Sequence, residues 1–285
     1  MSLKNLLKMP KLVSRRLRAG RQIRAFDHQT DILGTYDRSG LADGYLKSKI
    51  DHVLCSPGLT ERMINSPLHV RPDETSGAFY NWTIPAFLWD AILKSQTLNS
   101  MVSAYLGPRV RLDDLYVKSV TDGLDSISEG WHDDNVGYRL KVFMVFDVEG
   151  EPAPTLLVPS SRPNLYRVNA WDELSRFLLK PKTDDRGRSV RISYEKGDCL
   201  VFDTNVTHRG DYSSTSGVRY CVIAEFIDRD KADALNGRAP CGPGQGRRQI
   251  RIPSIEGVDL MRHPLLDRSL LRVDPQGAMY GYPKA

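Results

Sequence analysis

The feature that most limits the possible folds of this sequence is a series of short, β-rich segments in its second half. These segments are rich in β-branched and aromatic residues, and they are separated by Gly, Asp, Ser and Pro, which are residues that form turns. Eight strands with closely spaced turns favour a jelly roll, in which two sheets face each other with a cavity between them. The segments are residues 114–120, 126–131, 139–147, 155–158, 190–194, 199–202, 206–208 and 218–227.

The preceding part of the chain has a different pattern. Residues 40–108 are mainly helical in character, because apolar residues recur at spacings of three and four within 42–54 and 84–106. The Gly107-Pro108 pair ends the second of these helices. We therefore predict an α+β protein: an all-β, cupin-like jelly-roll core, also called a double-stranded β-helix, with a helical N-terminal region packed on it.

The length allows one large domain or two small ones. With 285 residues, of which 40% are apolar, the chain can bury a sizeable core, and we favour a single domain. A long polar insertion between two core strands is often a lid or a substrate loop. The predicted parts are a basic N-terminal arm at 1–26, one domain at 27–228 with a helical region at 40–108, a jelly-roll core at 114–228 and an insertion at 160–189, and a C-terminal extension at 229–285.

The excess of positive charge behind the net charge of +5 lies in the first 26 residues. Residues 1–26 hold eight Lys and Arg and no acidic residue, whereas the other 259 residues carry 32 basic and 35 acidic groups. A nucleic-acid-binding surface needs clustered basic residues on the body of the fold, so we expect no nucleic-acid partner. The arm is interpreted as a solvated segment, as a short basic helix in weak contact with an anionic surface, or as an organelle transit peptide.

Neither a membrane span nor a disulfide framework is expected. No apolar run approaches the roughly 20 residues that cross a bilayer, and no secretory signal is recognised, so the expected location is the cytoplasm. The four cysteines, Cys55, Cys199, Cys221 and Cys241, form no CxxC pair and no zinc-ligand spacing. Reduced thiols are predicted.

A His-x-Asp motif and a distant histidine suggest a metal site. In an extended segment His132 and Asp134 point the same way, whereas Asp133 faces away. His208 follows a short apolar strand, and Arg219 comes eleven residues later. Two histidines and one carboxylate leave one face of an octahedral ion open, as in non-haem Fe(II) oxygenases. A lone His-x-Asp is often a surface hydrogen bond, but the later histidine, the strands and the arginine favour a metal.

Arg219 is a candidate for binding an anion. Residues 210–217 are rich in turn formers, so a hairpin would fold Arg219 back beside His208. Its apolar neighbours indicate a strand that is at least half buried, and a buried guanidinium needs an anion. Such a group binds a carboxylate through two parallel hydrogen bonds.

With this order of strands, His132-x-Asp134, His208 and Arg219, the chain resembles the Fe(II)/2-oxoglutarate-dependent dioxygenases, and most closely the phytanoyl-CoA dioxygenase family. The similarity extends from about residue 114 to 226. Supporting segments are Leu115–Lys118, Leu156–Ser161 and Gly197–Asp203.

The resemblance implies that His132, Asp134 and His208 are the catalytic iron ligands. It also implies that Arg219 binds the far carboxylate of the cosubstrate 2-oxoglutarate. The implied reaction uses dioxygen to hydroxylate a small molecule and releases succinate and CO2. Asp134 stands where halogenating relatives have a small residue, which favours hydroxylation. The alternative is a catalytically lapsed jelly-roll protein that binds metal or serves as a scaffold.

Two further residues are assigned to the cosubstrate by the same resemblance. The family often has a hydroxyl residue two positions after the distal histidine, whereas this chain has Gly210. Tyr116 or Lys118 from the first strand is therefore expected to help bind 2-oxoglutarate. Several cations, among them Arg139 and Lys141, are candidates for meeting an anionic substrate, although such residues more often lie on a solvated face.

Overall fold

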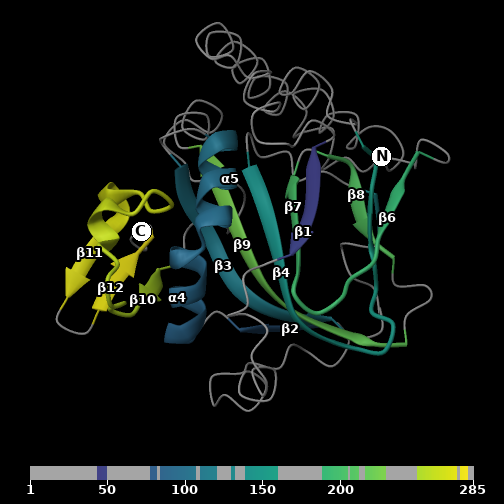
Figure 1. Cartoon of the computed structure of the whole chain (residues 1–285), viewed down its shortest axis with the longest axis horizontal. Coiled ribbons are helices and arrows are strands. Elements are labelled where there is room, and N and C mark those ends of the chain that lie inside the picture. Colours follow the sequence, from purple (N-terminus) through teal and green to yellow (C-terminus); the bar gives the residue numbers. More distant parts are fainter. Residues whose placement is uncertain are drawn as a thin grey trace, which may run out of the picture.

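A computed structural model shows a β-rich molecule in which antiparallel sheets dominate (Figure 1). The predicted arm at 1–26 and all but two residues of the predicted insertion at 160–189 lie outside the residues that the structure describes. The structure describes residues 44–49, 78–81, 84–106, 110–120, 130–131, 139–159, 188–204, 206–211, 216–228, 249–274 and 277–281.

The largest element is a six-stranded sheet with the order β1-β7-β4-β9-β3-β2, in which all neighbours are antiparallel. Its two long central pairings, β4 with β9 and β9 with β3, run through the middle of the molecule (Figure 1). The strands are β1 (Tyr45–Lys49), β2 (Ala78–Asn81), β3 (Val110–Val120), β4 (Arg139–Glu149), β7 (Asp198–Asp203) and β9 (Val218–Asp228).

A second, three-stranded sheet has the order β6-β5-β8 and is formed by β5 (Thr155–Leu157), β6 (Val190–Ile192) and β8 (His208–Gly210). The chain passes from the large sheet to the small one after β4, returns at β7, crosses again at β8 and returns at β9. Side chains of both sheets share one apolar cluster. This alternation between two packed antiparallel sheets is the pattern of a jelly roll, as predicted. Six of the eight predicted strands are present near their predicted positions, and β8 begins at His208, the last residue of the strand predicted at 206–208. The remaining one, 126–131, lies almost wholly outside the described residues.

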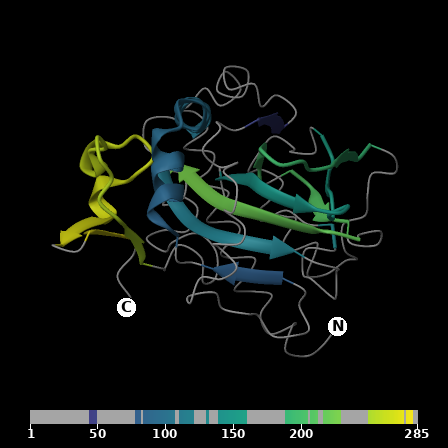
Figure 2. The same ribbon diagram turned by 60° about the horizontal axis from the view of Figure 1, so that its bottom comes forward.

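Two helices, α4 (Ala86–Lys94) and α5 (Gln96–Leu106), confirm the helical pattern predicted at 84–106. They pack on the face of the large sheet that points away from the small sheet (Figures 1 and 2). Ser95 separates them, and its hydroxyl accepts a hydrogen bond from the N–H of Leu98 at 3.2 Å, which caps α5. Among the described residues, no helix is long and apolar enough to cross a membrane.

The helical region predicted at 40–108 is wrong in two described parts: β2 occupies Ala78–Asn81, and β1 occupies Tyr45–Lys49, within the helix predicted at 42–54. The strand β1 pairs along its whole length with β7, about 150 residues later in the sequence. A five-residue strand contributes little local signal, so a long-range pairing overrides the helical spacing.

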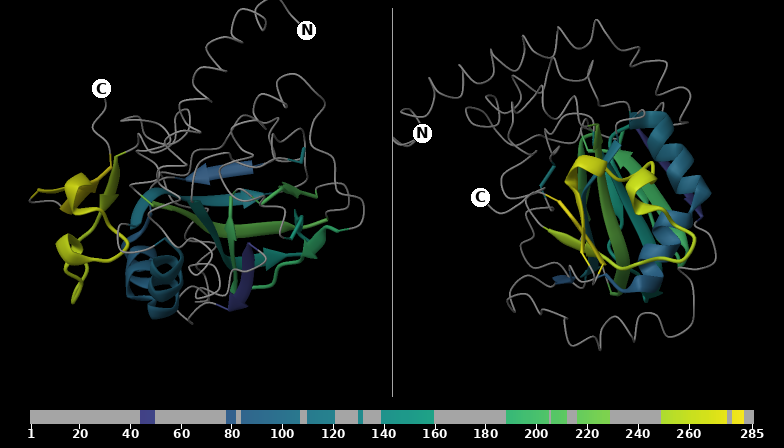
Figure 3. Two further views of the ribbon diagram at one scale, coloured as in Figure 1. Left: turned by 90° about the horizontal axis from the view of Figure 1, so that it is seen from above. Right: turned by 90° about the vertical axis from the view of Figure 1, so that its left-hand side faces the viewer.

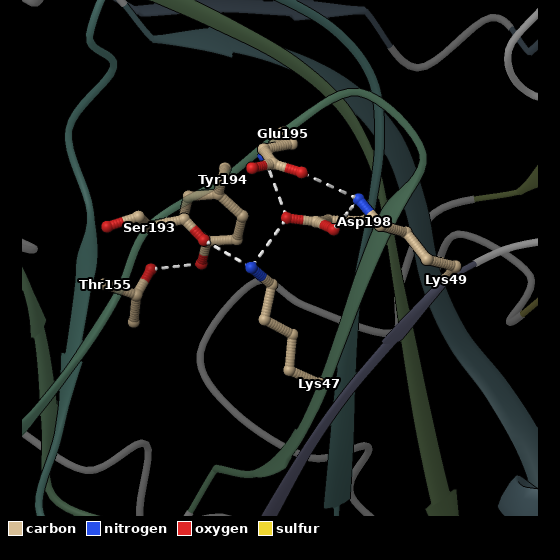
Figure 4. Close-up of polar contacts among 7 residues, drawn as sticks. All are labelled: Lys47, Lys49, Thr155, Ser193, Tyr194, Glu195 and Asp198. Atoms are coloured by element: carbon tan, nitrogen blue, oxygen red, sulfur yellow. Dashed lines mark hydrogen bonds and ion pairs between the residues drawn. The ribbon is translucent and has the colours of Figure 1, made fainter.

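The contact between β1 and β7 is reinforced by ion pairs on Asp198, which is fully buried (Figure 4). Lys47 Nζ lies 2.8 Å from one carboxylate oxygen, and Lys49 Nζ lies 2.6 Å from the other. The backbone N–H of Glu195 donates to Asp198 at 2.8 Å, and Lys47 also donates to the carbonyl of Ser193 at 2.9 Å. These bonds hold the edge strand in place.

The described part of the C-terminal extension forms a third sheet, ordered β10-β12-β11. It lies beside α4 and the start of β3 (Figure 3). The backbone N–H of Leu112 donates to the carbonyl of Leu265 at 3.1 Å, and Leu265 belongs to the same apolar core as the helices. The strands are β10 (Ile250–Ile252), β11 (Leu271–Asp274) and β12 (Gly277–Tyr280), and two short 3-10 helices, η3 (Leu260–Arg262) and η4 (Arg268–Leu270), lie between β10 and β11.

Cys199 and Cys221 are buried free thiols, in agreement with the prediction of reduced cysteines. Burial raises the pKa of Cys199 to about 12, and it also raises the pKa of Cys221. Both groups therefore stay protonated near neutral pH. The other two cysteines, Cys55 and Cys241, lie outside the described residues.

Candidate active site

The two faces of the large sheet differ in how completely they are covered. On the face that meets the helices, side chains such as Val142 and Val222 are 0% exposed. The opposite face, which we call the inner face, points toward the small sheet. Solvent reaches part of it, because four neighbouring side chains there are only half-buried: Tyr116, Lys118, Lys141 and Phe143.

The strand register arranges the inner-face side chains in rows across the sheet. Directly opposed residues of antiparallel strands have Cβ atoms about 5 Å apart, and successive rows lie about 7 Å apart. The first row holds Phe202, Lys141 and Glu225, the second Leu200, Phe143, Ile223 and Tyr116, the third Val145, Cys221 and Lys118, and the fourth Arg219.

His208, the predicted distal ligand, is the first residue of β8 and is 5% exposed. Its Nδ1 lies 2.7 Å from the carbonyl oxygen of Val206. A carbonyl only accepts, so Nδ1 carries the proton and Nε2 carries the lone pair, which is the arrangement of a histidine that ligates a metal. The ring also packs edge-on against Phe202, with centroids 4.9 Å apart. His208 therefore fits the role of a ligand in tautomer and in orientation.

Arg219 lies on the inner face of β9 and is also 5% exposed. Its guanidinium carbon lies 4.1 Å from the ring centroid of Tyr194 and 5.4 Å from that of Phe143. Nη1 donates to the carbonyl of Ala153 at 3.4 Å. Aromatic faces attract a cation, so these contacts fix the guanidinium without neutralising its charge.

Tyr194 does not supply a negative charge to this group. Its hydroxyl is 2.5 Å from the hydroxyl of Thr155, and the ring is buried. Burial raises the pKa of Tyr194 to about 12, although the charge of Arg219 acts in the opposite direction. The phenol is therefore neutral at physiological pH.

One aromatic cluster brings His208 and Arg219 together from opposite sheets. Phe202 contacts His208, and Phe143 lies under the guanidinium of Arg219. The two phenylalanine rings meet edge-on, with centroids 5.4 Å apart. That the distal histidine and the arginine share one site stays a prediction.

The motif that carries the other two predicted ligands begins beside β8. Trp131 directly precedes His132. The guanidinium carbon of Arg209, the residue after His208, lies 5.2 Å from the ring centroid of Trp131. His132 and Asp134 themselves lie outside the described residues. Within the described ranges, no group of three His, Cys, Asp or Glu side chains could hold a metal ion. The complete set of ligands thus stays a prediction.

Tyr116 and Lys118 both lie on the inner face, as a site residue requires, but they differ in position. The hydroxyl of Tyr116 is 3.4 Å from Oε1 of Glu225, six residues along β9 from Arg219. Lys118 is directly opposite Cys221, whose thiol donates to the carbonyl of Lys118 at 3.4 Å. Their assignment to 2-oxoglutarate stays a prediction.

The sequence did not indicate a buried network of charges at the other end of the inner face. Arg139 and Glu225 are 0% exposed and form an ion pair. Arg139 Nη2 also lies 3.2 Å from Asp113, and Lys141 Nζ lies 3.4 Å from Glu225. The signal for this network was present in the strands, as single charged residues at alternate positions among apolar ones.

No family model and no curated protein matches the sequence. Among solved structures, the fold is similar to the non-heme α-ketoglutarate-dependent epimerase SnoN from nogalamycin biosynthesis, with 17% identity over 69% of this chain and 81% of that chain and a TM-score of 0.47. HygX from Streptomyces hygroscopicus, with nickel and 2-oxoglutarate bound, gives 14% identity, 70% and 87% coverage and a TM-score of 0.48. EctD from S. alaskensis is 14% identical over 72% of this chain and 80% of that chain, with a TM-score of 0.48.

Proposed function

We propose that the protein is an Fe(II)- and 2-oxoglutarate-dependent oxygenase that hydroxylates a small molecule and releases succinate and CO2. In this proposal His132, Asp134 and His208 hold the iron, and Arg219 binds the far carboxylate of 2-oxoglutarate. The observation that carries the proposal is the convergence of His208 and Arg219, from two facing sheets, on one aromatic cluster.

The donor set suits Fe(II). Two imidazoles and one carboxylate occupy one face of the ion and leave positions open for a cosubstrate and dioxygen. The bound iron supplies the activation of dioxygen, and the chain supplies orientation and binding. His208 is held by the carbonyl of Val206 on one nitrogen and by the ring of Phe202 on one side. Such an orienting hydrogen bond fixes the ligand nitrogen that points toward a metal.

The contact between Trp131 and Arg209 supports a place for the His-x-Asp motif near His208. Consecutive Cα atoms are 3.8 Å apart, so His132 comes one residue after a contact with the neighbour of His208. Side chains of an extended segment alternate, and His208 and Arg209 point to opposite faces of β8. In the extended segment predicted for the motif, His132 and Asp134 would share the side opposite Trp131.

Arg219 has the chemistry to bind a carboxylate. Its guanidinium is planar and always charged, and it offers two parallel N–H donors to the two oxygens. The neutral Tyr194 and the phenyl ring of Phe143 surround it, and a low dielectric strengthens its attraction for an anion. In this proposal one end of 2-oxoglutarate would meet the metal and its far carboxylate would meet Arg219.

The proposal is tested by succinate release from the Fe(II)-loaded chain, supplied with 2-oxoglutarate and a panel of lipid, acyl-thioester, amino-acid and natural-product candidates. We expect Asp134→Ala and His208→Ala to abolish coupled turnover, because each removes a ligand. Asp133→Ala is the matched control, since this carboxylate is predicted to face away, and it should retain turnover.

Full activity of the Asp134→Ala variant would show that the carboxylate is wrongly assigned, and Asp133 would then be the candidate. If the parent chain releases no succinate with or without any member of the panel, the protein is better described as a metal-binding scaffold.

A further inference from the structure

The buried charges at one end of the inner face have no evident role in stability. Arg139 bridges Asp113 and Glu225, and Arg111 lies 3.7 Å from Asp113. A further carboxylate, Asp114, accepts from the backbone N–H of the following residue at 3.0 Å. Removing such charges from water costs about as much as their attraction returns. Stability alone therefore does not account for the network.

The accessible members of this network are hydrogen-bond donors. The side chain of Lys141 is 14% exposed, whereas those of Glu225 and Asp113 are 0% exposed. Lys141 Nζ and the hydroxyl of Tyr116 both lie 3.4 Å from Oε1 of Glu225. The two carboxylates are thus fully buried, whereas the ammonium-bearing side chain of Lys141 and the phenol-bearing side chain of Tyr116 are partly exposed to solvent.

These donors and Arg219 lie on opposite sides of the aromatic cluster. Lys141 is directly opposite Phe202, the ring that contacts His208. The guanidinium of Arg219 instead covers Phe143, at the other end of the cluster. If Arg219 takes the far carboxylate of 2-oxoglutarate, the end beside Lys141 is left for the substrate.

We infer that Lys141 and Tyr116 bind an anionic oxygen group of the substrate, a carboxylate or a phosphate, and that Glu225 positions both donors. Of the two residues predicted to help bind 2-oxoglutarate, this inference leaves that role to Lys118 alone. This inference rests on the proposed function for the place of 2-oxoglutarate, and it adds the substrate class. A lysine ammonium binds either anion as a point charge, and a phenol adds one directed hydrogen bond. Glu225 is fixed in turn by its ion pair with Arg139.

The test measures equilibrium binding of inorganic phosphate and of acetate to the full chain, loaded with Fe(II) and saturating 2-oxoglutarate without oxygen. Lys141→Met keeps the length of the side chain but removes the charge, and it should weaken anion binding roughly ten- to a hundredfold. Tyr116→Phe removes one oxygen only and should weaken binding by about two- to tenfold. Whichever of phosphate and acetate binds with the higher affinity identifies the class of anion.

The matched control is Lys94→Met, which removes a lysine of α4 that lies 2.6 Å from Asp90 on the helical side of the molecule. It should leave anion binding unchanged. Equal anion affinity in Lys141→Met and the parent, or no binding to the parent, would overturn the inference. A raised half-saturating 2-oxoglutarate concentration in Lys141→Met would also overturn it, since Lys141 would then belong to the cosubstrate.

Binding requires no turnover, so the two proposals fail separately. If Lys141→Met loses anion binding and the parent chain never releases succinate, the oxygenase proposal is rejected and the anion site is retained. Succinate release with unchanged anion binding in every variant would retain the oxygenase and reject the anion site.

Discussion

Arg219 is a cation held against two aromatic rings in the interior of the molecule. A cation over an aromatic face gains about 0.5 to 2 kcal/mol, which is less than the cost of removing a charge from water. The contacts with Tyr194 and Phe143 therefore orient the guanidinium but do not replace an anionic ligand. Under the proposed function, the far carboxylate of 2-oxoglutarate would bind this guanidinium.

We expect Arg219→Ala to raise the half-saturating concentration of 2-oxoglutarate roughly ten- to a hundredfold, because a charge-assisted hydrogen bond contributes about 1.5 to 3 kcal/mol. Arg219→Lys should restore only part of the loss, since an ammonium lacks the planar pair of donors. Succinate release measured against 2-oxoglutarate concentration gives the result, with iron content as the control. An unchanged dependence at full iron content would contradict the assignment of the cosubstrate.

Only part of this environment could be predicted from sequence. His208 and Arg219 are eleven residues apart with a turn-rich stretch between them, so the expectation that they lie near one cluster is a local matter. The contact of Arg219 with Phe143 depends on the register of β4 and β9 within the large sheet, and its contact with Tyr194 depends on where the segment after β6 lies. No local spacing in the sequence encodes these contacts, because the three side chains come from segments far apart in the chain.

The strand β1 shows how a short strand is held at the edge of a sheet. Asp198 receives bonds from Lys47, Lys49 and the backbone of Glu195 (Figure 4). Burial alone would raise the pKa of Asp198, but the hydrogen bonds from the two lysines outweigh it and the pKa is lowered. The bound carboxylate is thus favoured in its charged form.

The sign of the resulting pH dependence follows from the lowered pKa. The unfolded chain has a carboxyl pKa of about 4, so the stabilisation is fully present above that pH and is lost as the pH falls through the lower value of the folded state. Asp198→Asn should reduce the free energy of unfolding by about 1 to 3 kcal/mol at pH 7. The difference from the parent should shrink below about pH 4.

Chemical denaturation at several pH values measures this difference. Asp90→Asn is the control, because Asp90 also has a lysine partner at 2.6 Å but lies on an exposed helix surface. It should change the free energy of unfolding by less than about 1 kcal/mol. A loss in Asp198→Asn that stays the same from pH 7 to pH 3 would show that the charge of Asp198 is not what holds β1.

The elements themselves differ in how far the sequence predicts them. The helical stretch at 84–106 repeats its apolar residues locally, and a spacing of three and four is enough to identify it. The strand β1 has five residues, and its partner β7 is far away in the sequence. Its structure is decided by that partner and by Asp198, so local periodicity gave the wrong element.

The C-terminal sheet completes the apolar core on the helical side of the molecule. Ile252, Leu265 and Tyr280 are buried in the same cluster as Leu88 and Trp89 of α4. The hydroxyl of Tyr280 accepts from the backbone N–H of Asp267 at 3.0 Å, and burial raises its pKa, so it stays neutral. This part of the chain is therefore expected to unfold together with the jelly roll.

Leu265→Ala should lower the free energy of unfolding by about 2 to 5 kcal/mol, because the side chain is 0% exposed and its loss leaves a cavity. Val273→Ala is the control: this residue is 67% exposed, and its substitution should cost about 0.5 kcal/mol or less. Both variants should unfold in one cooperative transition. A separate early transition that leaves the rest unaffected would show that the C-terminal sheet is an independent unit.

The position of β9 between two bulged neighbours has a consequence for mutagenesis. Its register shifts with β3 between Leu112 and Asp114 and with β4 between Val145 and Asp147, so the extra residues fall on its neighbours and β9 itself alternates without interruption. A substitution scan along this strand should therefore give two interleaved phenotypes. Tyr220, Val222, Ala224 and Phe226 should report on folding alone, whereas Arg219 and Glu225 on the other face should also report on ligands.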